Sequence, residues 1–233
     1  MRFEQPLLEG TLIRRDKRFV ASVQLETGEE IAAHCANPGS MNGLSEPGSK
    51  VLVSVNDNPK RRFKHHLEIV YSGRTPVGIH NGRSSAVVCE AIIAGRIEEL
   101  AGYATMRQNA RHNDRRIDLV LEGNGLRTCN ILVKNVTMAN NRVALYPDTD
   151  ADRDIEELQE LTDIVREGSR AMVIFVAQRS DVDTFSPADS VDPEYGQAFR
   201  DALARGVEVL SFRAKVTRKG IELHDKLPLA AQN

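Results

Sequence analysis

The sequence predicts an α+β protein of two domains, a β-barrel over residues 1–80 and a mixed α/β domain over residues 81–233. Two observations lead to this prediction. The first part consists of short alternating runs of apolar and polar residues separated by turn residues, which is typical of small antiparallel barrels. The second part alternates helical and strand patterns, which favours a sheet with helices on its faces. The join is expected near residues 72–83, which are rich in glycine and proline.

Three segments of the first part are expected to form the barrel strands. The segment "TLIRRDKRFVASVQLETGEEIAAHC" alternates around the turn at Thr27 and Gly28. A Pro-Gly turn leads into "PGSKVLVSVND", and "HHLEIVYSG" forms a further strand. About four or five short strands in so short a segment fit a small barrel.

The second part opens with a predicted helix in "SSAVVCEAIIAGRIEEL", which Ser84 or Ser85 would cap. Val88, Ile92 and Ile97 follow helical spacing in this segment. Strands are expected next over 116–122 and 129–136.

The remaining elements continue the alternation. A second helix over 152–167 should end at Gly168, and "RAMVIFVAQ" is apolar throughout, as buried central strands are. A third helix in "DPEYGQAFRDALARG" has Pro193 near its start and Gly206 at its end. The strand "VEVLSFRAKV" follows, and "GIELHDKLP" can pair back with it.

Composition limits the class of protein. The chain has 233 residues, of which 41% are hydrophobic, and a mean hydropathy of -0.36, values typical of soluble globular proteins. No apolar run approaches the roughly 20 residues that span a bilayer, and no signal peptide is apparent, so no membrane partner is expected. Cys35, Cys89 and Cys129 are widely spaced in apolar surroundings, which indicates buried thiols and a cytoplasmic location.

The net charge of -2 conceals an uneven distribution along the chain. Two basic clusters lie in the first part, whereas the stretch from Asp148 to Glu167 is acidic. The basic residues are Arg14, Arg15, Lys17, Arg18, Lys60, Arg61, Arg62 and Lys64. This asymmetry indicates an anionic partner for the barrel.

The second basic cluster, in "NPKRRFKHH", contains Phe63. Lysine and arginine neutralise phosphates, and an aromatic ring can stack on a base, so the segment fits nucleic-acid binding. The alternative is a solvated charged turn. The segment "HCANPGSMNG" also has two interpretations. Its tight turn at Asn37, Pro38 and Gly39 either exposes backbone amides that can bind a phosphate or is closed by the Asn37 side chain.

A predicted hairpin in "IDLVLEGNGLRTCNILVKNVTM" carries Asp118 on one strand and Lys134 on the next. In metal-dependent phosphodiester hydrolysis, carboxylates hold Mg²⁺ or Mn²⁺ and a lysine stabilises negative charge. Glu90, on the preceding helix, could add a second carboxylate. The position where such sites carry a further acid is Leu132, which shares a strand face with Lys134. The alternative for Asp118 and Lys134 is a cross-strand ion pair.

The acidic run "PDTDADRDIEELQEL" does not fit a calcium-binding EF-hand loop. Counted from Asp148, the sixth position is Arg153 instead of glycine, and the twelfth is Gln159 instead of glutamate. The acids instead favour the N-terminus of the following helix.

These segments together resemble the sugar fermentation stimulation protein A (SfsA) family. The similarity covers nearly the whole chain and includes "RRDKRFVASV", "HCANPGSM", "SVNDNPKRRFKHHLEIV", "CEAI", "GYATMRQNAR", "RRIDLVL", "VKNVTM", "YPD", "FSPADSVDPEYGQAF" and "RGVEVLSFRAKV". The resemblance implies an N-terminal OB-fold barrel and a C-terminal domain like the PD-(D/E)xK nucleases. It also implies DNA binding with little sequence preference and a regulatory role in sugar (maltose) metabolism. Glu90, Asp118 and Lys134 would occupy the metal-site positions.

The chain departs from the family pattern on the expected catalytic face. Leu132 replaces an acid, and the stretch Asp154 to Leu158 carries acids where the family has a lysine and a histidine. Leucine cannot bind Mg²⁺, and the acids would repel phosphate, so we expect a degraded nuclease-like site. The primary hypothesis is therefore a DNA-binding regulator. The alternatives are a Mg²⁺- or Mn²⁺-dependent nuclease of DNA or RNA, and a non-catalytic regulator that binds a protein or a sugar metabolite.

Overall fold

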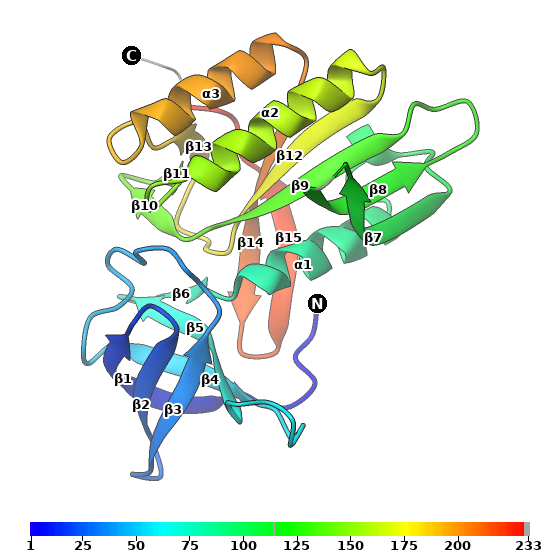
Figure 1. Cartoon of the computed structure of the whole chain (residues 1–233). Coiled ribbons are helices and arrows are strands. Elements are labelled where there is room, and N and C mark those ends of the chain that lie inside the picture. The colour runs from blue at the N-terminus through cyan, green and yellow to red at the C-terminus, as the bar shows by residue number, and fades with distance from the viewer. Residues whose placement is uncertain (114, 231–233) are drawn as a thin grey trace.

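The computed structural model describes residues 1–113 and 115–230. Its strands β1 to β5 close into a barrel, which lies below the α/β domain in Figure 1. The strands are β1 (Leu8–Asp16), β2 (Val20–Leu25), β3 (Glu30–Cys35), β4 (Lys50–Val55) and β5 (His65–Ser72). The strand order is β3-β2-β1-β4-β5, and a parallel pairing of β3 with β5 closes the barrel. A short strand, β6 (Thr75–Gly78), extends β5.

The barrel interior follows from the alternation in the sequence. Ala21, Val23 and Leu25 on β2 point inward, and the side chains between them point outward or lie half-buried. The three segments predicted as barrel strands are confirmed.

The C-terminal domain is built on a mixed sheet of six strands in the order β15-β14-β12-β9-β8-β7. Its strands are β7 (Thr105–His112), β8 (Arg115–Glu122), β9 (Cys129–Val136), β12 (Arg170–Ala177), β14 (Glu208–Thr217) and β15 (Gly220–Lys226). Strand β12 is parallel to both of its neighbours, β9 and β14, and every side chain after Arg170 in it is buried. The prediction of a buried central strand is therefore confirmed.

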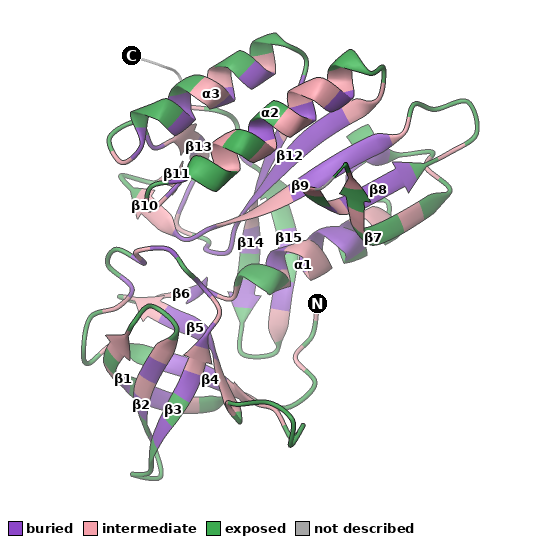
Figure 2. Ribbon diagram, in the orientation of Figure 1, coloured by how far each residue is buried: buried purple, intermediate pink, exposed green. Residues whose placement is uncertain are grey.

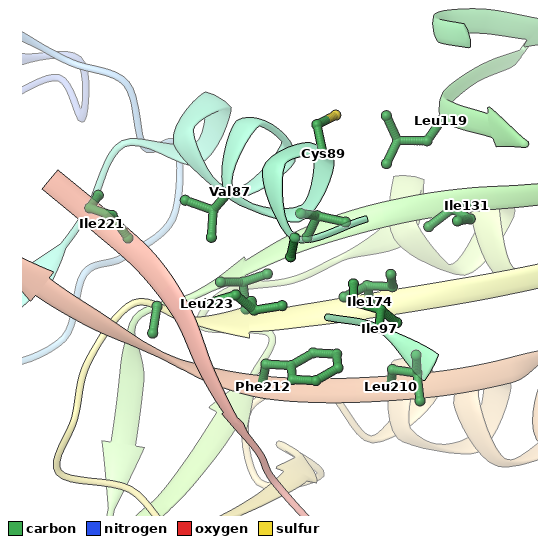
Figure 3. Packing of buried hydrophobic residues seen from close by; sticks show 14 of the residues in the cluster. Val87, Cys89, Ile97, Leu119, Ile131, Ile174, Leu210, Phe212, Ile221 and Leu223 are labelled. Carbon is green, nitrogen blue, oxygen red and sulfur yellow. The ribbon is translucent and has the colours of Figure 1, made fainter. Parts of the chain in front are cut away.

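Helices cover both faces of this sheet. Helix α1 (Asn81–Ile93) packs on one face, where Val87 belongs to the same hydrophobic cluster as Ile131 of β9, Ile174 of β12 and Phe212 of β14 (Figure 3). Helices α2 (Asp152–Arg166) and α3 (Pro193–Ala204) cover the opposite face, as Figure 1 shows. A small sheet of β10 (Met138–Asn140), β11 (Val143–Tyr146) and β13 (Thr184–Pro187) lies beside them.

The first predicted helix is wrong in two details. The residue before α1 is His80, no side chain caps the helix, and Ser84 is instead buried inside it. The helix ends at Ile93, so Ile97 belongs to the following loop, which contains a short 3-10 turn, η1 (Glu98–Leu100). Gly95, whose φ is +67°, follows this end, as glycines commonly do after helices.

The barrel and the sheet share apolar contacts. Leu52 of β4 and Ile69 of β5 are fully buried, and they belong to the same hydrophobic cluster as Val87 of α1. Figure 2 shows buried residues on the strands of both domains. Among the described residues, no helix has the length and apolar character needed to cross a membrane.

Candidate nucleic-acid interface and nuclease-like pocket

Asp118 lies where strands β8 and β9 separate. Their pairing covers Leu119 to Leu121 and does not extend to Asp118. The freed carboxylate accepts a hydrogen bond from the backbone N–H of Val133 at 2.9 Å, and Arg116 lies 3.3 Å away. Asp118 is therefore held at a strand fork, with one of its oxygens already bonded to the backbone.

Lys134, which directly follows Val133 in strand β9, is held by helix α2. Its Nζ donates to Oδ1 of Asp154 at 2.6 Å and also to Glu157. The Lys134 side chain is only 14% exposed, and the hydroxyl of Tyr146 donates to the other oxygen of Asp154. Burial alone would lower the pKa of Lys134, but the two carboxylates raise it above its ordinary value.

Leu132 shares the strand face of Lys134, as the alternation predicted. It is buried in the cluster that contains Leu158 of α2 and Phe175 of β12. Asp154 and Glu157 belong to the stretch in which this chain carries acids in place of basic residues. The departures from the family pattern therefore lie together on one face of the sheet.

Glu90 points to a different place. Its carboxylate pairs with the amino group of Met1 at 2.6 Å, and its side chain is 54% exposed. The structure therefore does not bring Glu90 together with Asp118 and Lys134. Within residues 1–113 and 115–230, no group of three or more His, Cys, Asp or Glu side chains is arranged to hold a metal ion. The described contacts of Glu90 and Asp118 share no partner, and their binding of Mg²⁺ or Mn²⁺ stays a prediction.

The segment that directly follows the first basic cluster meets residues of the second cluster in one groove. Phe19, directly after Lys17 and Arg18, lines the same groove as Arg61, Arg62 and Phe63 from the β4–β5 loop. We call this the outer groove. Its volume is about 410 Å³, and its remaining lining residues are Val20, His34 and His66. Phe19 is 51% exposed, so its ring is accessible from the groove.

The side chains of the first basic cluster differ in the hydrogen bonds and ion pairs that they make within the protein. Arg15 donates to the backbone oxygens of Asn37, Gly39 and Ser40 at 2.7 to 3.1 Å, so it holds the loop after β3 in place. Arg14 pairs with Asp16 at 2.8 Å, and Arg18 donates to the backbone oxygen of Pro38 at 3.2 Å. In this cluster, the described contacts leave Lys17 as the exposed side chain most available to a phosphate.

The second cluster lies on the surface. Lys60, Arg61, Arg62 and Lys64 are all exposed, and the guanidinium of Arg62 lies 5.4 Å from the centre of the Phe63 ring. A guanidinium over the face of an aromatic ring is attracted by the ring and places positive charge directly beside it. This combination is suited to a base next to a phosphate.

The turn after β3 is closed by its own side chain. Oδ1 of Asn37 accepts from the N–H of Gly39 at 2.8 Å, and Asp148 accepts from the N–H of Met41 at 3.0 Å. A carboxylate at this position opposes the binding of a phosphate. Of the two readings of this segment, the structure supports the self-closed turn.

Three histidines at or beside the outer groove were not predicted as site residues from the sequence. His34 stacks on Phe63 with ring centres 5.8 Å apart, and His66 lies edge-on to His34 at 5.4 Å. His80 follows at 6.4 Å from His66. His34 and His66 stand in the segments "HCANPGSM" and "KHHLEIV". Their side chains become neighbours only because β3 pairs in parallel with β5.

Fold and site together define a two-domain protein in which an OB barrel with a basic, aromatic surface precedes a mixed α/β domain. Family profiles match both parts: "SfsA N-terminal OB domain" over residues 13–79 and "Sugar fermentation stimulation protein RE domain" over residues 82–220. The chain belongs to the sugar fermentation stimulation protein family, and the predicted family and fold class are confirmed.

Relatives match along the full length. The chain is 44% identical to a sugar fermentation stimulation protein homolog of Geobacter sulfurreducens, with 97% of both chains covered. It is 46% identical to a homolog of Thioalkalivibrio sulfidiphilus, covering 96% of this chain and 95% of that one. The solved structure of Pyrococcus furiosus SfsA in complex with Ca²⁺ is 23% identical, covers 99% of this chain and 98% of the other, and superposes with a TM-score of 0.89.

Proposed function

We propose that this protein binds DNA through its barrel, mainly by contacts to the phosphate backbone and by stacking, and that it does not cleave the strand. The observation that carries the proposal is the outer groove, in which two clusters distant in sequence place Phe19 and Phe63 beside Arg61 and Arg62. Backbone contacts carry no base readout, so little sequence preference is expected.

The α/β domain supports binding without hydrolysis. A nuclease lysine must face the reacting phosphate, whereas Lys134 is enclosed by Asp154 and Glu157. Leu132 supplies no metal ligand, and Glu90 is directed to Met1. The remaining acid, Asp118, would have to hold a metal with water alone. In the cytoplasm, such a protein would act as a regulator, and the name of its family suggests sugar metabolism as the process.

The test is fluorescence anisotropy with labelled single- and double-stranded DNA of one sequence, and with the matching RNA. Five exposed basic side chains, Lys17, Lys60, Arg61, Arg62 and Lys64, imply a log–log slope against salt of about -3 for single strands. Phe63→Ala should weaken single-strand binding roughly tenfold, since one stacked base contributes about 1–3 kcal/mol. Leu126→Ala, at an exposed apolar position of the β8–β9 turn, is the matched control and should bind like the parent.

Binding that is insensitive to salt, or no binding at all, would refute the proposal. The same samples are incubated with Mn²⁺ and analysed for strand cleavage. Cleavage by the parent that disappears in Asp118→Ala would show the alternative, a metal-dependent nuclease. Binding with intact strands is the expected result.

A further inference from the structure

A second hollow adjoins the outer groove and reaches towards the α/β domain. We call it the inner hollow; its volume is about 570 Å³, and its lining includes Arg2, His34, Arg61, His66, His80 and Arg83. His34, Arg61 and His66 line both spaces. The inner hollow and the outer groove are therefore neighbouring spaces that border on the same three side chains.

Two ring nitrogens in the inner hollow have no partner. Nε2 of His66 and Nδ1 of His80 are buried, and neither makes a hydrogen bond with any described residue. Buried polar atoms are normally satisfied, so two of them lining one polar hollow indicate a site for a polar ligand.

The charged side chains around the hollow include two arginines that have no described acidic partner. Glu68, on β5, is fully buried and neutralised: Arg83 donates to it through two nitrogens, and Ser54 donates at 2.8 Å. Arg2 and Arg61 are exposed and have no acidic partner within the described part of the chain. Two exposed acids, Glu4 and Asp57, also line the hollow, and Asp57 accepts from Gln5 at 3.2 Å.

We propose that the inner hollow binds the phosphate of a nucleotide unit whose base stacks on Phe63 or Phe19 in the outer groove. This inference rests on the proposed function, and it names the place where one phosphate is recognised individually. Arg61, at the border of the two spaces, contacts the phosphate oxygens, and the imidazole rings of His66 and His80 lie beside them. Arg2 approaches from the N-terminal segment that crosses the hollow.

Phosphate binding at this place is coupled to proton uptake. Burial and nearby cations lower the pKa of His66 and His80, although Glu68 acts in the opposite direction. A phosphate beside the two rings raises their pKa, because it favours the charged imidazolium. Affinity therefore increases as the pH falls from the pKa of the complex towards that of the free protein. The charged or titratable groups that face the rings are Arg2, Glu4, His34, Asp57, Arg61, Glu68 and Arg83.

The test has a part that does not require DNA binding. Proton NMR resolves the imidazole signals, which His66→Gln and His80→Gln assign, and each is titrated with thymidine 5′-monophosphate and with thymidine. The monophosphate should raise the pKa of both histidines, and thymidine should not. If neither pKa changes at saturating monophosphate, the inner hollow is not a phosphate site, whatever the protein does with DNA.

The second part measures the affinity for single-stranded DNA as a function of pH. Parent protein should bind up to about tenfold more tightly at pH ~6 than at pH ~8. This is the ratio expected if binding raises the pKa of one histidine by about one unit. His66→Gln should lose most of this dependence. His65→Gln, the adjacent half-buried histidine outside both spaces, is the matched control and should retain it.

The outcomes separate the two proposals. Salt-dependent DNA binding with unchanged histidine pKa values would keep the proposed function and overturn the phosphate site. A raised histidine pKa with the monophosphate but no binding of DNA would keep the phosphate site and redirect it to free nucleotides. Equal loss of pH dependence in His65→Gln and His66→Gln would also overturn the inference, since only His66 lines the hollow.

Discussion

Nζ of Lys134 on strand β9 lies 2.6 Å from Oδ1 of Asp154 on helix α2. This contact, with the second one to Glu157, ties the helix to the sheet at the point where a nuclease would need its lysine free. The chain has kept the lysine and surrounded it with acids. Its role here is therefore the neutralisation of two half-buried carboxylates.

Lys134→Met should destabilise the protein strongly. Asp154 and Glu157 would remain in a poorly solvated place without their cation, and breaking a buried pair in this way typically costs about 3–5 kcal/mol. Urea unfolding measures the difference. Arg153→Met removes a largely exposed partner of the same Glu157 and should cost less than about 1 kcal/mol. Equal losses in both variants would contradict the structural role of Lys134.

Leu132→Glu should not restore cleavage. The new carboxylate would enter the apolar cluster under α2, where burial of an uncompensated polar group costs about 2 kcal/mol or more. Lys134 would also remain bound to its two acids. Incubation of labelled DNA with the variant and Mn²⁺ should leave the strand intact, and the appearance of specific cleavage products would show that one ligand alone had inactivated the pocket.

Arg15 and Arg61 should behave differently although both belong to basic clusters. Arg15→Met removes hydrogen bonds to four backbone oxygens, so it should lower the unfolding free energy by roughly 1–3 kcal/mol and leave the salt slope of DNA binding unchanged. Arg61→Met should reduce that slope by about 1 and leave stability nearly unchanged. Salt titrations and urea curves of both variants decide between these roles.

His112 should make stability depend on pH. The ring is hydrogen-bonded to Glu160 of α2 and to Glu167, which directly follows α2, and both raise the pKa of His112 above its usual 6.5. Since the folded protein holds the proton more tightly, the contact stabilises fully below pH 6.5 and loses its effect as the pH rises through the folded pKa. His112→Gln should thus lower the Tm at pH ~6 and have little effect at pH ~9. The loss should be at most about 1 kcal/mol, because the contact is partly exposed.

Arg83→Met should be the most damaging change at the junction of the two domains. Glu68 is fully buried, and Arg83 supplies the charge that compensates it. Without Arg83, unfolding should cost about 3–5 kcal/mol less at neutral pH. The double variant with Glu68→Gln should recover part of the loss, since no buried charge then remains. Absence of any recovery would show that Arg83 acts by packing on Phe3 instead.

Periodicity was sufficient to predict most elements of the fold. The strand over 129–136 and the central strand after Gly168 are unbroken apolar or alternating runs, and structure and prediction agree there. Strand β7 was not predicted, because as an edge strand it has one neighbour and mostly exposed side chains. The small sheet of β10, β11 and β13 was missed as well, since its three-to-four-residue strands are too short to show a period.

The candidate site was less accessible to prediction. Sequence reasoning placed Asp118 and Lys134 on neighbouring strands, but the side on which a helical carboxylate points depends on how the helix is rotated against the sheet. Glu90 therefore faces Met1, and the acids that reach Lys134 come from α2. The basic clusters were visible in the sequence, whereas the histidines between them required the closure of the barrel.

The hydrophobic cluster that contains Leu52, Ile69 and Val87 has a consequence for how the protein unfolds. Side chains of the barrel complete the interior of the neighbouring domain, so separating the two parts exposes apolar surface on both. Heating should consequently produce a single calorimetric peak, whose enthalpy corresponds to the whole chain. A nucleotide bound at the barrel would then slow hydrogen exchange in strands as far away as β12, because both regions open in the same cooperative event.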